Sequence, residues 1–112
     1  MSEWVEVCPM SDFTDRSKLF VHQNKRIALF RLKDGIYALD DTCSHAQYSL
    51  SEGEIINGQV ECPGHGAMFD IRTGHHLNFP AVTHVNSYPV KIEDDRIFVK
   101  IENEKEDYSD FD

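Results

Sequence analysis

Long apolar runs and positive charge are both scarce in this sequence. No stretch approaches the ~18 consecutive apolar residues of a membrane helix, and the segment after Met1 lacks the basic and apolar regions of a secretory signal. Lys and Arg number 11 against 20 Asp and Glu, for a net charge of −9. This shortage of cations excludes duplex DNA and anionic lipid as natural partners, because phosphate binding needs a basic surface. We therefore expect an acidic, soluble, cytoplasmic protein.

Cysteine is scarce as well. The chain has 3 cysteines, Cys8, Cys43 and Cys62, and an odd number in a reducing compartment predicts no disulfide framework. Cys8 falls in a predicted early strand and is expected to be a buried core thiol. Cys43 and Cys62 each lie close to a histidine, which favours a metal or cluster site.

Tight-turn dipeptides divide the chain into short strands. Asp34-Gly35 separates the apolar segments 26–33 and 36–39, and this pattern predicts a β-hairpin, although the residue types in 26–33 also permit a helix. Asn57-Gly58 predicts a second hairpin by the same rule. Further strands are predicted at 4–9, 18–22, 68–71, 75–77, 87–93 and 96–102. Short strands with turns at this density indicate an all-β sandwich or barrel.

Length and composition predict one domain with a tail. A chain of 112 residues suits a single domain, and no repeat or low-complexity linker divides it. From Glu102 to Asp112 the chain carries 6 acidic residues against Lys105 alone, with no apolar periodicity. We expect a folded domain over residues 1–102 and an acidic C-terminal tail over 103–112.

Two short segments each combine a cysteine with a histidine. Cys43 and His45 lie in the first, Cys62 and His65 in the second, and 16 residues separate His45 from Cys62. The hairpin at Asn57-Gly58 would bring the two segments side by side. Two thiolates and two imidazoles can hold tetrahedral zinc. The mixture of both ligand types in each loop is better suited to a two-iron cluster, in which the cysteines hold one iron and the histidines the other.

The pattern Cys43-x-His45 and Cys62-x-x-His65 resembles the Rieske [2Fe–2S] motif. The further matching positions are the segments 49–53 and 65–70, the Thr73-Gly74 turn and Pro80. The resemblance implies a Rieske fold, with an antiparallel β-sandwich or barrel base and a small cluster-binding subdomain of two loops at about 41–82. It also implies that Cys43 and Cys62 hold the inner iron, and that His45 and His65 hold the outer iron near the surface.

In length the chain most resembles the soluble Rieske ferredoxins of bacterial aromatic-ring dioxygenases. The resemblance implies a monomeric one-electron carrier that catalyses nothing alone. It would pass electrons from an NAD(P)H-dependent flavoprotein reductase to a terminal ring-hydroxylating oxygenase. Two alternatives are a small Rieske subunit of a nitrite-reductase-like complex and, in a different class, a zinc-stabilised interaction module. Many of the nitrite-reductase-like small subunits lack the four cluster ligands, whereas all four are present in this sequence.

Four positions differ from the high-potential Rieske proteins of respiratory complexes. Where those proteins have a disulfide between the cluster loops, this chain has Tyr48 and Gly64, so that no bridge can form. Where they have a serine and a tyrosine that bond to cluster sulfurs, it has Ala67 and Phe69. Fewer hydrogen bonds to sulfur predict a reduction potential of roughly −150 mV, the low end of the Rieske range. Gly64 is expected to leave one side of the cluster more open.

Overall fold

The computed structural model describes residues 2–42, 48–64, 66–77 and 84–102. Regular structure in these segments is almost entirely antiparallel β-strand, which confirms the predicted all-β class. Two short 3-10 helices are present, η1 (Met10–Asp12) and η2 (Leu50–Glu52). Within the described segments, no helix is long and apolar enough to cross a membrane.

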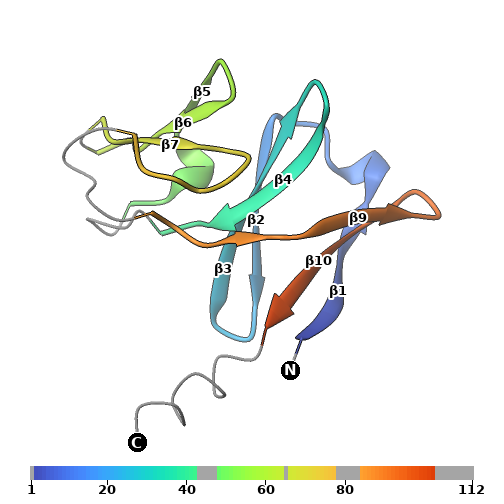
Figure 1. Ribbon diagram of the computed structural model, residues 1–112. Helices are drawn as coiled ribbons and strands as arrows, with labels where there is room; N and C mark the ends of the chain where they lie inside the picture. The colour runs from blue at the N-terminus through green and yellow to red at the C-terminus, as the bar shows by residue number, and fades with distance from the viewer. Residues whose placement is uncertain (1, 43–47, 65, 78–83, 103–112) are drawn as a thin grey trace, which may run out of the picture.

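The strands form three antiparallel sheets (Figure 1). The first contains β1 (Ser2–Pro9), β10 (Arg96–Glu102) and β9 (Val90–Glu93), in that order. The second contains β2 (Ser17–His22), β3 (Lys25–Leu32), β4 (Gly35–Asp40) and β8 (Ser87–Tyr88). The third, much smaller sheet contains β5 (Glu54–Ile56), β6 (Gln59–Glu61) and β7 (Met68–Asp70).

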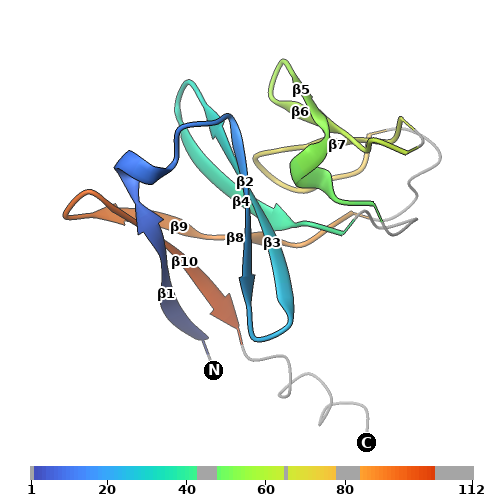
Figure 2. The same cartoon turned by 180° about the vertical axis from the view of Figure 1, so that it is seen from behind.

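Strand β3 is covered on both faces. Ile27 and Leu29 pack in a core shared with β10, whereas Ala28 and Phe30 pack in a second core shared with β6 and β7. All four side chains are fully buried. Figure 2 shows the same order from behind, with β3 and β4 between the β1–β10 pair and the β5–β7 sheet. Apolar residues therefore occupy both faces of 26–33, and the predicted strand is confirmed in place of a helix.

The tight turn at Asn57-Gly58 lies where the sequence predicts it, whereas the turn of the β3–β4 hairpin lies one residue earlier than predicted. Asn57 and Gly58 have φ values of 51° and 79°, as a mirror-image two-residue turn requires. At the β3–β4 hairpin, Leu32 pairs with Gly35, so the turn residues are Lys33 and Asp34. Gly35 has a φ of 152°, and this unusual conformation belongs to the first residue of β4.

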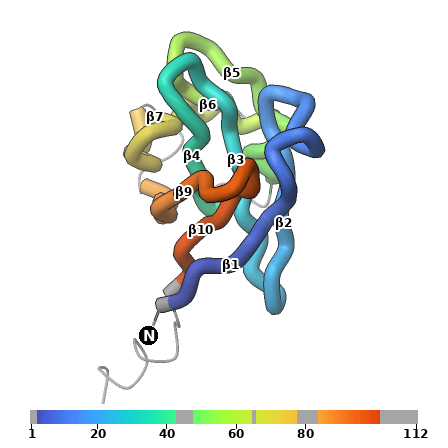
Figure 3. Tube along the Cα trace, turned by 90° about the vertical axis from the view of Figure 1, so that its right-hand side faces the viewer, coloured from blue at the N-terminus to red at the C-terminus, as the bar shows by residue number. Residues whose placement is uncertain are grey.

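The predicted strand at 87–93 is two strands in the structure. β8 pairs with β4 of the second sheet, and β9 pairs with β10 of the first. Pro89 lies between them and has no N–H to continue a ladder. Its carbonyl accepts a hydrogen bond of 3.0 Å from the Lys100 N–H. The chain therefore passes from the second sheet to the first at Pro89. Figure 3 shows the first sheet below the β5–β6 hairpin.

Candidate metal centre

The third sheet carries the one predicted ligand that the structure describes. Cys62 directly follows β6, and its side chain is only 1% exposed. Its thiol is free, and it packs in the same apolar core as Ala67 and Phe69. The other three predicted ligands, Cys43, His45 and His65, lie outside the described residues. A buried, reduced cysteine in a loop fits the role of a thiolate ligand to iron.

The loop that follows Cys62 is closed at its base by backbone hydrogen bonds. The Cys62 N–H donates to the Ala67 carbonyl at 2.7 Å, and the Gly66 N–H donates to the Cys62 carbonyl at 3.1 Å. The β6–β7 ladder continues from this point, with Glu61 paired to Met68. Because both ends of the loop are tied to each other, the position of Cys62 is set by the sheet.

The first predicted loop is closed at its base in a similar way. Thr42 and Ser49, which flank it, form an antiparallel bridge. The Leu50 N–H then donates to the Asp41 carbonyl at 2.6 Å. Both predicted cluster loops therefore start and end at paired backbone.

Asp41 is the only charged residue that is buried in the described segments, and it is fully buried. Its carboxylate accepts hydrogen bonds from the Ser49 hydroxyl at 2.5 Å and from the Ser51 N–H at 2.9 Å. The half-exposed Arg26 guanidinium lies 3.4 Å from the same carboxylate. Sequence reasoning missed Asp41, and the only available signal was an acidic residue between an apolar strand and the first cysteine. Asp41 holds the base of the first loop through charge-assisted hydrogen bonds.

Tyr48 and Gly64 bring the two loops into contact. A Cβ atom built on Gly64 would lie 2.2 Å from the Tyr48 Cε2 atom, so the aromatic ring takes the space that a side chain at position 64 would need. The ring is 42% exposed and forms part of the surface here. The ring of the other loop therefore lies against Gly64, and the expectation that Gly64 leaves one side of the cluster more open stays a prediction.

Three imidazole rings stack beside β7. The ring centroids of His75 and His76 are 5.3 Å apart, and those of His75 and His84 are 6.4 Å apart. His76 forms a bridge with Phe69 of β7. The Nδ1 atom of His76 is buried and has no hydrogen-bond partner in the part of the chain that the structure describes. Parallel rings do not aim their nitrogens at a common point, and no group of three or more His, Cys, Asp or Glu side chains among the described residues could hold a metal.

The donor chemistry of the site fits a two-iron cluster. Cys62 supplies a buried thiol, and the sequence supplies one more cysteine and two histidines in two loops whose bases are closed. Ala67 and Phe69, fully buried beside Cys62, bring no hydroxyl group to its sulfur. Among the described residues, the buried side chains that share this core with Cys62 are therefore apolar.

The sequence is similar to a known protein family and to proteins of known function. The sequence model described as Rieske [2Fe-2S] domain matches residues 3–89. The anthranilate 1,2-dioxygenase ferredoxin subunit of Burkholderia cepacia is 38% identical over 102 residues, which cover 90% of this chain and 94% of that protein. The ferredoxin component of the naphthalene 1,2-dioxygenase system of Pseudomonas putida is 34% identical over 100 residues, which cover 88% and 96%.

A solved structure agrees at the level of the fold. It is titled as a complex of reduced oxygenase and oxidized ferredoxin in carbazole 1,9a-dioxygenase. A chain of this complex superposes on the present one with a TM-score of 0.79 and 31% sequence identity, over 86% of this chain and 91% of the other.

Proposed function

Because the chain belongs to the Rieske [2Fe–2S] family, we propose that it passes single electrons from an NAD(P)H-dependent flavoprotein reductase to a terminal ring-hydroxylating oxygenase. The observation that carries this proposal is the similarity to dioxygenase ferredoxins over 94% to 96% of their own length. The chain is an electron-transfer component and not a catalytic enzyme. Its cofactor is a Rieske-type [2Fe–2S] cluster, which supplies a centre that takes up and releases one electron.

We assign Cys43 and Cys62 as ligands of one iron, and His45 and His65 as ligands of the other. The buried, free thiol of Cys62 and the paired bases of both loops support this assignment. In this arrangement the chain holds the ligands in place through β6, β7 and Asp41. The Tyr48 ring lies against the Gly64 backbone and so brings the two loops into contact.

The proposal extends to the organisation and the surroundings of the chain. Residues 1–102 form the Rieske domain, with a cluster-binding subdomain at about 41–82, and residues 103–112 form an acidic tail. The protein acts as a monomer in the cytoplasm and binds neither nucleic acid nor membrane. Its net charge of −9 supports this reading, since an acidic surface is suited to partners with basic docking faces.

Spectroscopy of the purified holoprotein tests the cofactor and its ligands. We expect a red-brown protein whose signal after dithionite reduction has an average g of about 1.9. Replacing Cys43 or Cys62 by Ala should abolish both colour and signal. The matched control is Cys8→Ala, because Cys8 is also buried but lies in β1. A colourless, silent wild-type protein would contradict the cluster and support the zinc-stabilised module.

Reconstitution tests the partners. The holoprotein should couple NADH oxidation by a ferredoxin reductase to turnover by a ring-hydroxylating oxygenase. Turnover should fall as salt rises past about 0.15 M, where charges are screened within roughly 8 Å. No turnover with any oxygenase, together with activity in a nitrite reductase complex, would favour the nitrite-reductase-like alternative.

A further inference from the structure

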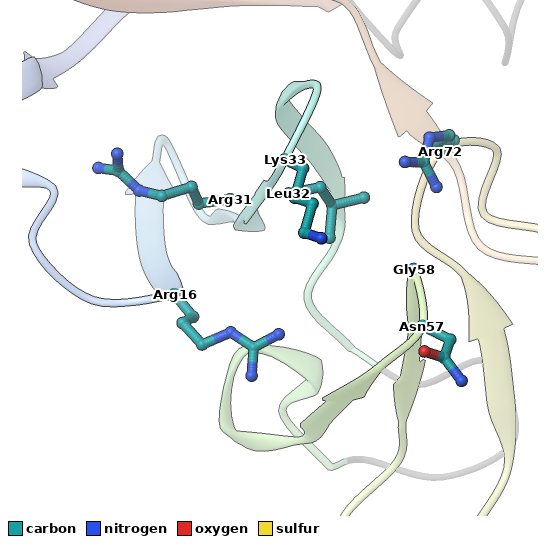
Figure 4. A pocket seen from close by; sticks show the side chains of 7 residues that line it. All are labelled: Arg16, Arg31, Leu32, Lys33, Asn57, Gly58 and Arg72. Atoms are coloured by element: carbon teal, nitrogen blue, oxygen red, sulfur yellow. The ribbon is translucent and has the colours of Figure 1, made fainter.

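A basic cavity lies between the second and third sheets, away from Cys62. Its volume is about 600 Å³, within the ordinary range of small-molecule sites. It is formed by the residues before β2, the β3–β4 turn, the Asn57-Gly58 turn and the segment after β7 (Figure 4). The Asn57-Gly58 turn and Cys62 lie at opposite ends of β6, so the cavity is separate from the predicted metal centre.

Cations dominate the lining of this cavity. Arg16, Arg31, Lys33 and Arg72 line it, which is 4 of the 11 Lys and Arg residues in a chain of net charge −9. No acidic side chain is part of the lining. The cavity is therefore a local positive region.

The four cations differ in their availability. The Arg31 guanidinium points away from the cavity in Figure 4, donates to the Phe13 carbonyl and lies over the Phe13 ring. Arg16 and Lys33 have exposed side chains that form no hydrogen bond or ion pair with a described residue. Two uncompensated charges therefore remain available at the cavity for a ligand.

Arg72 is held in place by its neighbours. Its Nε and Nη2 atoms donate to the two oxygens of Asp34 at 3.1 and 3.0 Å. A Cβ atom built on Gly58 would lie 2.7 Å from the Arg72 Nη1 atom, so only a glycine lets this edge of the guanidinium lie against the turn. The Arg72 guanidinium, whose charge is paired with Asp34, thus forms a positioned part of the cavity wall beside the Asn57-Gly58 turn (Figure 4).

We propose that this cavity binds a small anion that carries phosphate groups. Guanidinium and ammonium groups that approach from different sides suit the several oxygens of a phosphate. The Asn57 side chain adds a neutral hydrogen-bonding group to the lining. An anion bound here meets the charges of Arg16 and Lys33 without using any residue of the metal centre.

Calorimetric titration of the holoprotein with inorganic pyrophosphate at low ionic strength tests the site. We expect saturable binding at one site with a Kd below about 1 mM. The double variant Arg16→Gln/Lys33→Gln should bind at least tenfold more weakly. Lys91→Gln/Lys100→Gln is the matched control, since it removes the same charge from β9 and β10 and should stay within about twofold of the wild type.

The possible outcomes separate this site from non-specific attraction and from the electron-transfer role. Absence of saturable binding, or equal weakening in both double variants, would overturn the proposal. Citrate should bind at least tenfold more weakly than pyrophosphate, and equal binding would overturn the assignment to phosphates. The visible and EPR spectra should be the same in all variants, because no substituted residue lies in the predicted cluster loops. If the cluster assignment is wrong, the wild type lacks the expected colour and EPR signal, and the titration with pyrophosphate is unaffected.

Discussion

Replacing Asp41 by Ala should loosen the base of the first cluster loop and strongly destabilise the protein. The substitution leaves the partly buried Ser51 N–H without its acceptor at 2.9 Å, which costs about 1–3 kcal/mol. The Ser49 hydroxyl loses its bond to the carboxylate but can turn to the Ser51 hydroxyl, 2.9 Å away. Arg26 is about half exposed, so water solvates it. With the cavity left behind, the total is about 3 kcal/mol.

The matched control is Asp34→Ala. Asp34 also forms an ion pair with an arginine, Arg72, but its carboxylate is exposed to solvent and water replaces the lost contact. Thermal denaturation of both holoproteins, followed by circular dichroism and by cluster absorbance, compares the two sites. For a domain of this size, about 3 kcal/mol lowers the Tm by roughly 12 °C or more. If Asp41→Ala lowers the Tm no further than Asp34→Ala does, Asp41 does not anchor the loop.

Three further predictions concern the contact between the loops, the sulfur environment and the exposed ion pair. Gly64→Ala should lower the Tm because its Cβ would lie 2.2 Å from the Tyr48 ring, and Tyr48→Ala in the same chain should restore part of the loss; additive effects would contradict the contact. Phe69→Tyr should raise the reduction potential in protein-film voltammetry, because it adds a hydroxyl to the core that holds Cys62. Phe20→Tyr, which packs against the other core, should leave the potential unchanged, and equal potentials in the two variants would contradict this reasoning. The Arg72 guanidinium hydrogen-bonded to Asp34 lowers the pKa of that carboxyl from 3.8; the pair therefore stabilises the protein above pH 3.8 and this contribution disappears as the pH falls through the lowered value. The Tm difference between the wild type and Arg72→Gln should shrink between pH 5 and pH 2, and a constant difference would contradict the ion pair.

Local sequence rules predicted the elements whose geometry depends on neighbouring residues. Asn57-Gly58 required a particular turn, and the structure has it. The Asp34-Gly35 turn after 26–33 favoured a strand over the helix that its residue types also permit, and the structure has the strand, between two cores. The sequence predicted one strand over 87–93 in spite of Pro89. The two halves join different sheets, and the strands that they pair with lie far away in the sequence.

The candidate site divides in the same way. The spacing of the cysteines and histidines predicted Cys62 as a ligand, and the structure buries its free thiol. The role of Asp41 and the contact between Tyr48 and Gly64 arise from residues that lie 10 and 16 positions apart and meet only in the folded chain. No local pattern marks such contacts, so sequence reasoning alone could not find them.

The buried core under the β5–β7 sheet is shared with the second sheet. Ala28, Phe30 and Leu39 of the second sheet belong to the same cluster of buried residues as Cys62 and Phe69. A peptide cut from 41–82 would lose these side chains and expose apolar surface, so it should not fold by itself. The cluster-binding subdomain and the second sheet should then unfold together as one cooperative unit. Any change that loosens β3, however far from the iron, should therefore also shorten the lifetime of the bound cluster.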